Sequence, residues 1–191
     1  MSKNIKYRIT FHSDWHCGSG LAAGADVDAL VIKDNDGMPF VPGKTIKGLV
    51  REAIDIVWSE KEKNISIYNQ VFGREGEVRS ESFFRNAVML DDERTYILSV
   101  DAAQYMYRSI ASTAIDGDGI ADDNNLRKIQ VTVPCALTGE ILNVHDEMVE
   151  PVIQALKYIK RLGQWRNRGL GRCTIDVTDP QTTKDEKGGG L

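Results

Sequence analysis

A segment near the C-terminus concentrates the side chains that suit nucleic-acid binding. Residues 160–172 contain five basic residues, three glycines, one tryptophan and no acid. Glycines let a backbone approach a phosphate chain and donate its N–H groups, arginines neutralise phosphates, and an indole ring can stack on a base. A nucleic-acid contact and a solvated helix end followed by a glycine turn fit this segment equally well. The candidate contacts are Trp165, Arg166, Arg168, Gly169 and Gly171.

A second group of basic residues stands where an amphipathic segment begins. Lys44, Lys47 and Arg51 are three and four residues apart, so they share one face of a helix that opens at Pro42–Gly43. The positive end of a helix dipole also favours anions there. The pattern can hold a phosphodiester backbone, but taken by itself the stripe is better explained by solvent-facing cations. The glycine-rich signature of a P-loop is absent.

Acids and histidines supply the candidates for catalysis. Asp26 and Asp28 would lie on one side of an extended segment, where a carboxylate can bind a divalent ion or take a proton from a ribose 2′-hydroxyl. Their pattern alone favours solvent-exposed loop acids. His12 and His16 would share a strand face, but zinc would need further ligands. Residues 116–122 fit the middle of a calcium-binding EF-hand loop, but the first and the last ligands of such a loop are missing from the sequence around them. A flexible acidic loop is therefore favoured.

Hydrophobic periodicity predicts the elements that must position these residues. The order of strands and helices favours an α+β fold with helices on one face of an antiparallel sheet. Residues 59–82 carry no clear pattern, and residues 101–109 fit a short helix or an irregular insertion. Expected strands cover 6–12, 29–32, 83–90, 128–133 and 173–177, expected helices cover 43–57 and 147–162, and 135–142 is expected to form a hairpin around Thr138-Gly139.

Composition limits the class of protein. The 191 residues are 41% hydrophobic and 27% charged, which suits one domain at residues 1–178 followed by a disordered tail at 179–191. No apolar run approaches the ~20 residues of a membrane span, so no membrane contact is expected. The net charge of −4 means that a nucleic-acid site needs a local basic patch. Three widely spaced cysteines predict a cytoplasmic protein with reduced thiols.

Several motifs, taken in order, resemble the RAMP superfamily, and most closely the backbone subunit of type III CRISPR effector complexes. Each motif is modest, and their order and spacing over residues 5–178 carry the resemblance. The motifs are His16-x-Gly18, Asp28-x-x-Val31-Ile32-Lys33-Asp34, Met38-Pro39-Phe40-Val41-Pro42-Gly43-Lys44-Thr45-Ile46-Lys47-Gly48-x-x-Arg51 and Arg166-Asn167-Arg168-Gly169-Leu170-Gly171. Asn86 stands where an aspartate is common in the family.

This resemblance implies a ferredoxin-like, RRM-like domain with inserted loops, one of them a thumb-like hairpin at about residues 114–134. Copies of such a subunit stack along a CRISPR RNA beside other effector subunits, and the hairpin interrupts the guide–target duplex. The residues expected to contact RNA are His16, Gly18, Pro42, Gly43, Lys44, Lys47, Arg51, Trp165, Arg166, Arg168, Gly169 and Gly171.

The resemblance also places Asp28 where cleaving members carry the aspartate that cuts complementary target RNA. The expected reaction is attack of a ribose 2′-hydroxyl on the adjacent phosphate, with Mg²⁺ or another divalent cation. This would make the chain an endoribonuclease of antiviral defence. Two alternatives stay open. One is a non-catalytic structural or capping subunit of the same complex. The other is a metal-independent endoribonuclease that processes the CRISPR precursor through His12 or His16.

Overall fold

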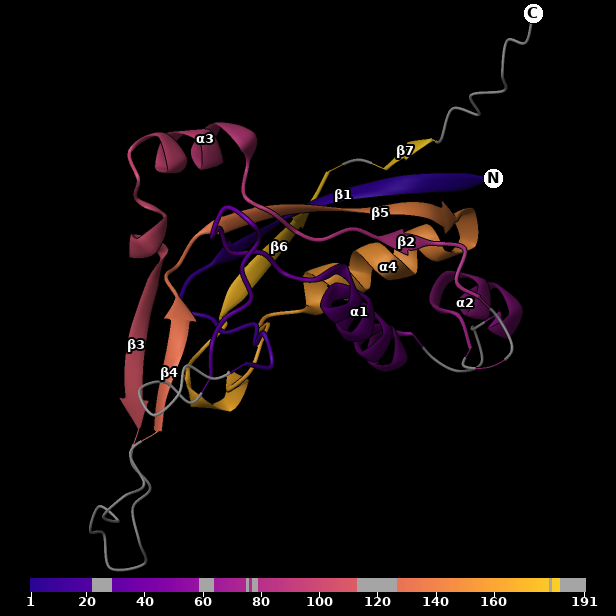
Figure 1. The fold of residues 1–191 in the computed structure, drawn as a ribbon. Helices are drawn as coiled ribbons and strands as arrows, with labels where there is room; N and C mark the ends of the chain where they lie inside the picture. The colour runs from indigo at the N-terminus through magenta and orange to yellow at the C-terminus, as the bar shows by residue number, and fades with distance from the viewer. Residues whose placement is uncertain are drawn as a thin grey trace, which may run out of the picture.

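One antiparallel sheet organises the fold of the computed structural model (Figure 1). The structure describes residues 1–21, 29–58, 64–74, 76, 79–112, 127–178 and 180–182. In space the strands follow the order β2-β5-β1-β6, and β7 pairs with the start of β1. The strands are β1 (Ser2–Phe11), β2 (Phe83–Phe84), β5 (Ala136–His145), β6 (Cys173–Val177) and β7 (Gln181–Thr182).

Two helices cover one face of this sheet (Figure 1). The helix α1 (Gly43–Val57) connects β1 to β2, and α4 (Asp146–Tyr158) connects β5 to β6. Apart from insertions, the chain order is therefore strand, helix, strand, strand, helix, strand. With the spatial order β2-β5-β1-β6, this is the ferredoxin-like arrangement. The expected α+β class, antiparallel sheet and one-sided helices are confirmed.

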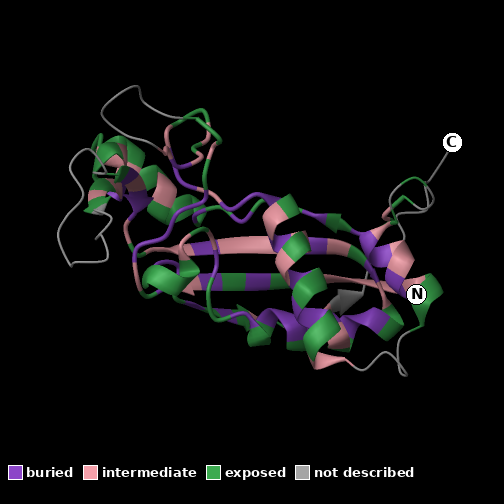
Figure 2. Cartoon of the chain, turned by 90° about the horizontal axis from the view of Figure 1, so that it is seen from below, coloured by how far each residue is buried: buried purple, intermediate pink, exposed green. Residues whose placement is uncertain are grey.

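Alternation along β1 decides which face the helices cover. Ile5, Tyr7 and Ile9 are buried, and the residues between them are exposed. The helix α1 buries Ile46 and Val50 on one apolar stripe. Figure 2 shows the same alternation of buried and exposed residues along the strands of the sheet. The buried faces of the sheet and of the two helices together form the main hydrophobic core.

Two insertions enlarge this framework. The first holds α2 (Ile65–Phe72), between α1 and β2. The second lies between β2 and β5. It contains α3 (Asp91–Ser99), a 3-10 turn η1 (Ala103–Met106), and a hairpin made of β3 (Tyr107–Ser112) and β4 (Arg127–Thr132). Figure 1 shows this hairpin at one end of the sheet, projecting to the side that carries α1 and α4.

The hairpin of β3 and β4 corresponds to the thumb expected at about residues 114–134. It begins earlier than expected, because residues 101–109 hold the 3-10 turn and the first half of β3. Its tip at residues 113–126, which includes the acidic segment 116–122, lies outside the described residues.

The hairpin predicted at residues 135–142 is wrong. The strand β5 runs through this segment and pairs with β1, with one register shift near Ile5. Gly139 stands opposite Tyr7, and a Cβ on Gly139 would lie 2.3 Å from Cζ of the Tyr7 ring. Gly139 therefore makes room for a core side chain, a role that the local turn signal does not reveal.

Other boundaries also need correction. Residues 29–32 form only isolated bridges, and the strand predicted at 83–90 is shortened to β2, with single bridges at Ala87 and Val88. The helix predicted at 147–162 begins at Asp146 and ends at Tyr158, because the chain becomes extended at Ile159. The helix predicted at 43–57 and the strand predicted at 173–177 have the bounds expected.

Several elements were not predicted, among them two helices and a short strand. The helix α3 buries none of its residues, so no apolar stripe marks it in the sequence. The short helix α2 lies in the segment without a clear pattern. The strand β7 extends the sheet beyond residue 178, into the expected disordered tail, whose residues 183–191 lie outside the described part. None of the helices in the described residues is long and apolar enough to cross a membrane.

Candidate nucleic-acid interface

A groove of about 430 Å³ opens beside the start of α1. Three segments that are distant in the sequence form it: the residues after β1, the first turns of α1 and the loop after α4. The structure brings together five of the predicted contacts here, namely His16, Gly18, Pro42, Lys44 and Arg166. Cys17, Ser19, Ile32, Thr45, Gly48, Leu49, Glu52, Gly163 and Gln164 complete the lining.

Gly43 lets the start of α1 pack closely against β2 beside this groove. A Cβ on Gly43 would lie 1.9 Å from the carbonyl oxygen of Phe84, so only glycine lets α1 begin so close to β2. The Gly43 N–H donates to Oδ1 of Asn86 at 2.9 Å, which caps the helix from the segment that follows β2. Lys44, directly after Gly43, is exposed, and the first turn contains no acid. The positive end of α1 therefore faces the groove with no carboxylate in its own first turn, and Glu52, two turns further along α1, is the acid in the groove lining.

Lys47 and Arg51 do not line the groove. Lys47 is half-buried, with its ammonium 5.9 Å from the centre of the Phe84 ring. Burial, and secondarily the charge of Arg51, lower the pKa of the Lys47 ammonium. Burial raises the pKa of the Tyr68 phenol, and a hydrogen bond with Arg51 opposes this. The two cations of the predicted stripe are therefore turned toward β2 and α2.

The glycine-rich loop after α4 is folded tightly against the end of β1. A Cβ on Gly163 would lie 2.5 Å from the His16 carbonyl oxygen, and one on Gly171 would lie 1.9 Å from the Leu162 carbonyl oxygen. The Gln164 N–H donates to that His16 oxygen at 2.8 Å. Gly163 and Gly171 thus make contacts within the protein. Gly169, with φ of 86°, has open space around its Cα.

Trp165 is also occupied by the protein. Its half-buried ring packs on a small second core that includes Ile129 and Leu170. The guanidinium of Arg168 lies 5.6 Å from the centre of the Trp165 ring. The indole, predicted as a stacking partner for a base, therefore already carries a cation over its ring. Arg166, next to it in sequence, is exposed at the groove.

His16 lies beneath the groove with one nitrogen unused. Its Nδ1 is 2.7 Å from the carbonyl oxygen of Gln130, and because a carbonyl only accepts, Nδ1 carries the proton. The Nε2 atom is buried and has no hydrogen-bond partner among the described residues. A Cβ on Gly18 would lie 3.1 Å from this Nε2. A side chain at position 18 would therefore crowd this nitrogen.

The residues predicted to cleave RNA through a carboxylate are not among those that the structure describes. Asp28 and Asp26 lie outside the described residues. The ends of their segment meet, because the Leu30 N–H donates to the Leu21 carbonyl oxygen at 3.0 Å, and Ala29 bridges to Ile129 of β4. The described residues on either side of segment 22–28 are therefore paired with each other, and Ala29 lies beside the middle of β4.

The remaining catalytic candidates give little support for a metal site. His12 contacts the Thr174 hydroxyl at 3.0 Å and does not line the groove. In the part of the chain that the structure describes, no cluster of three His, Cys, Asp or Glu side chains could hold a metal ion. No donor set for the expected divalent cation is thus present among these residues.

Several lining residues were missed by the sequence reasoning. Gly48 and Glu52 follow Lys44 at intervals of four, so helical spacing could have placed them on the same face. Gln164 lies inside the basic segment but carries no charge, and nothing in its type marks it as a lining residue.

Comparison with known proteins adds a family and a fold. A sequence model of the RAMP superfamily matches residues 8–174. A chain of the type III-B Cmr-beta complex bound to cognate target RNA, solved by cryo-EM, has a TM-score of 0.70 and 11% identity, with 91% of this chain and 96% of that chain covered. A chain of Cmr-beta in the apo state gives a TM-score of 0.68 at the same identity and coverage. Comparison with curated proteins gives no match.

Proposed function

The chain belongs to the RAMP superfamily, and from this premise we propose that it is an RNA-binding backbone subunit of a type III CRISPR effector complex. Its partners would be the CRISPR RNA, complementary target RNA, further copies of this chain and other effector subunits. The similarity of fold to chains of Cmr-beta complexes supports the assignment. A fold alone does not fix a function, and the groove is the feature of this chain that supports RNA binding.

The observation that carries the proposal is the convergence of three segments on one groove. Lys44, Arg166 and the positive end of α1 meet there, although the chain as a whole has a net charge of −4. Phosphates are bound by such exposed cations and by helix N-termini. His16 lies in the wall of the same groove, with its Nε2 atom unpaired among the described residues.

Binding of single-stranded RNA to the full chain tests this proposal. The measurement is fluorescence anisotropy of a labelled RNA with wild type, Lys44→Ala, Arg166→Ala and, as a matched control, Lys6→Ala. Lys6 is exposed on the sheet face opposite α1. We expect a several-fold rise in Kd for the two groove variants and none for the control. Equal losses in all three variants, or no binding by wild type, would contradict the proposal.

We further propose that Asp28 promotes cleavage of the target RNA. In this reaction a ribose 2′-oxygen attacks the adjacent phosphorus and the bond from phosphorus to the 5′-oxygen breaks. The products are a 2′,3′-cyclic phosphate and a 5′-hydroxyl, and one proton leaves the attacking oxygen while the departing oxygen gains one. The family resemblance carries this assignment, and the position of Ala29, next to Asp28 in sequence and beside β4 of the hairpin, is compatible with it.

The cleavage proposal is tested in the assembled complex with guide RNA, labelled target and Mg²⁺. Asp28→Asn should abolish regularly spaced cuts while guide binding persists, and Asp26→Asn provides a matched change in the same segment. A parallel reaction with EDTA measures the need for a divalent cation. Cuts that persist in Asp28→Asn would refute this role, and intact guide binding without cuts in wild type would leave a structural subunit.

A further inference from the structure

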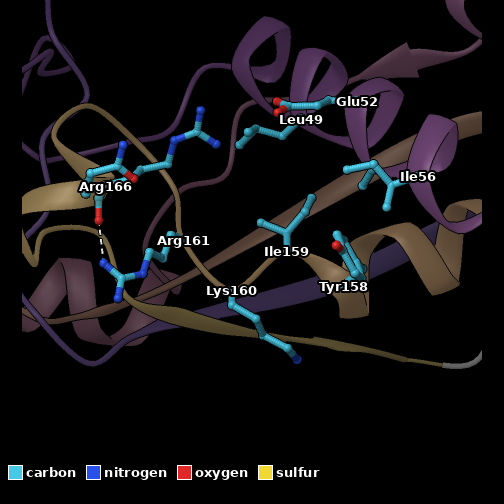
Figure 3. Close-up of a pocket in the computed structure, with 10 residues that line it drawn as sticks. Leu49, Glu52, Ile56, Tyr158, Ile159, Lys160, Arg161 and Arg166 are labelled. Atoms are coloured by element: carbon cyan, nitrogen blue, oxygen red, sulfur yellow. Dashed lines mark hydrogen bonds between the residues drawn. The ribbon is translucent and has the colours of Figure 1, made fainter.

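A second depression, of about 560 Å³, adjoins the candidate RNA groove. It lies between α1 and the segment that follows α4 (Figure 3). Leu49, Glu52 and Arg166 line both the groove and this depression, so the two are continuous. A strand held in the groove therefore has a neighbouring pocket within its path.

The walls of this pocket are apolar and partly uncovered. Ala53 and Ile159 are buried at its base, whereas Ile56 is 61% exposed and Tyr158 is 49% exposed. Figure 3 shows Tyr158, Ile159 and Ile56 on the side away from Arg166. An exposed aromatic ring beside aliphatic side chains suits the flat face of a nucleobase, because stacking is worth about 1–3 kcal/mol per base.

Two opposite charges flank the pocket without neutralising each other. Within the described residues, the Glu52 carboxylate and the Arg166 guanidinium make no hydrogen bond or ion pair. Figure 3 shows the Arg166 side chain reaching from its loop toward Glu52 on α1. The backbone of Arg166 is fixed, because its carbonyl oxygen accepts a hydrogen bond from the Arg161 guanidinium. The Glu52 carboxylate, an acceptor, and the Arg166 guanidinium, a donor, therefore both face the pocket without a partner among the described residues.

We propose that this pocket holds one unstacked guanine of a bound single-stranded RNA, an inference that rests on the proposed function. Guanine presents N1–H and N2–H donors on one edge, which a carboxylate accepts, and O6 and N7 acceptors on the next, which a guanidinium contacts in pairs. Glu52 takes the first edge, Arg166 the second, and Tyr158 stacks on the ring. Adenine places its N6 amino donor where Arg166 requires an acceptor.

The test compares four RNAs that differ at one base. Each is a labelled oligouridine of twelve residues, either unchanged or with a central guanosine, inosine or adenosine, and binding to the full chain is followed by anisotropy. The guanosine RNA should bind about fivefold to tenfold more tightly than oligouridine. Inosine, which lacks the N2 amino group, should give a smaller gain, and adenosine none.

Variants identify the residues responsible. Glu52→Gln keeps the shape of the side chain but removes the charge, and should bring the guanosine and uridine affinities to within about twofold of each other. Asp92→Asn makes the same charge change on α3, on the other side of the sheet, and should preserve the preference. Tyr158→Ala should weaken binding of the guanosine RNA, with the fold checked by circular dichroism.

The outcomes separate this inference from the proposed function. If wild type binds all four RNAs equally well, the guanine pocket is refuted and RNA binding stands. If wild type binds none of them, the proposed function fails first. If Glu52→Gln weakens binding of all four RNAs equally, or leaves the preference for guanosine unchanged, the pocket does not recognise guanine.

Discussion

Gly171 shows at the scale of one residue how the candidate interface is held in shape. Its φ of 70° lies in the left-handed region, and a Cβ there would lie 1.9 Å from the Leu162 carbonyl oxygen. Its N–H donates to the Asp14 carbonyl oxygen at 2.7 Å. Gly171 thus joins the loop after α4 to the end of β1, and this junction keeps Arg166 at the groove.

We expect Gly171→Ala to lower the melting temperature much more than Gly169→Ala. Both glycines have positive φ, but Gly169 has open space where a methyl group would lie. The strained backbone alone costs about 1 kcal/mol, whereas the clash at Gly171 adds several more. For a chain of this size we expect a shift of about 3 °C for Gly169→Ala and at least ~8 °C for Gly171→Ala. Thermal melts followed by circular dichroism measure both, and equal shifts would contradict the argument.

At the scale of one element, α3 is held mainly by charges, and the partly buried Ile97 is its apolar contact with the main core. It buries none of its residues. Arg94 pairs with Asp34 at 2.6 Å and also with Asp36, and these two acids belong to the turn before α1. Glu93 lies 3.7 Å from Arg8 of β1. A helix attached in this way should open locally without unfolding the domain.

Arg94→Ala should therefore release α3 and little else. We expect amide exchange across residues 91–99 to become at least ~10-fold faster, with only a small fall in the melting temperature, because the apolar contact that α3 gives up is the partly buried Ile97. Hydrogen exchange followed by mass spectrometry resolves the segment. Asp92→Asn provides the control on the same helix, since Asp92 makes none of these pairs. A large fall in melting temperature for Arg94→Ala would show that α3 is part of the cooperative core.

The attachment of α3 should also be lost in acid. Burial raises the pKa of Asp34, but hydrogen bonds from Arg94 and from the backbone N–H groups of Met38 and Asp36 outweigh it and lower the pKa below 3.8. Because the pKa of Asp34 is lowered in the folded state, its carboxylate stabilises α3 fully at a pH above the ordinary pKa of an aspartate. This stabilisation disappears as the pH falls through the lowered pKa. Exchange across 91–99, corrected for its intrinsic pH dependence, should therefore accelerate below about pH 4. Unchanged corrected rates would contradict the role of Asp34.

At the scale of the whole molecule, the sequence predicts the framework better than the contacts that close it. The alternation of Tyr7 and Ile9 and the apolar stripe of α1 repeat at regular intervals, so strand and helix are visible locally. The hydrogen bond from Gly43 to Asn86 and the ion pair of Asp14 with Arg108 join residues 43 and 94 positions apart. No pattern within a short stretch of sequence indicates that two residues so far apart are in contact.

Long-range contacts also decide which predicted residues reach the candidate site. Lys44 and Arg166 were predicted from charge and glycine content, and both reach the groove. Trp165 was predicted by the same reasoning, but its ring packs beside Arg168 and the second core. Residue type indicates what a side chain can do, and the fold decides whether it is free to do it.

Because the whole molecule is acidic, with a net charge of −4, it can bind RNA only through a local basic surface. The logarithm of the affinity for single-stranded RNA falls with that of the salt concentration, by about 0.7 for each phosphate neutralised. Removing both groove cations in Lys44→Ala/Arg166→Ala should flatten this slope by about 1.4. Asp91→Asn/Asp92→Asn on α3 raises the net charge from −4 to −2 but leaves the groove intact, so the slope should stay as in wild type. Anisotropy titrations at four salt concentrations measure both slopes, and a steeper slope in the α3 variant would mean that overall charge, not the groove, drives binding.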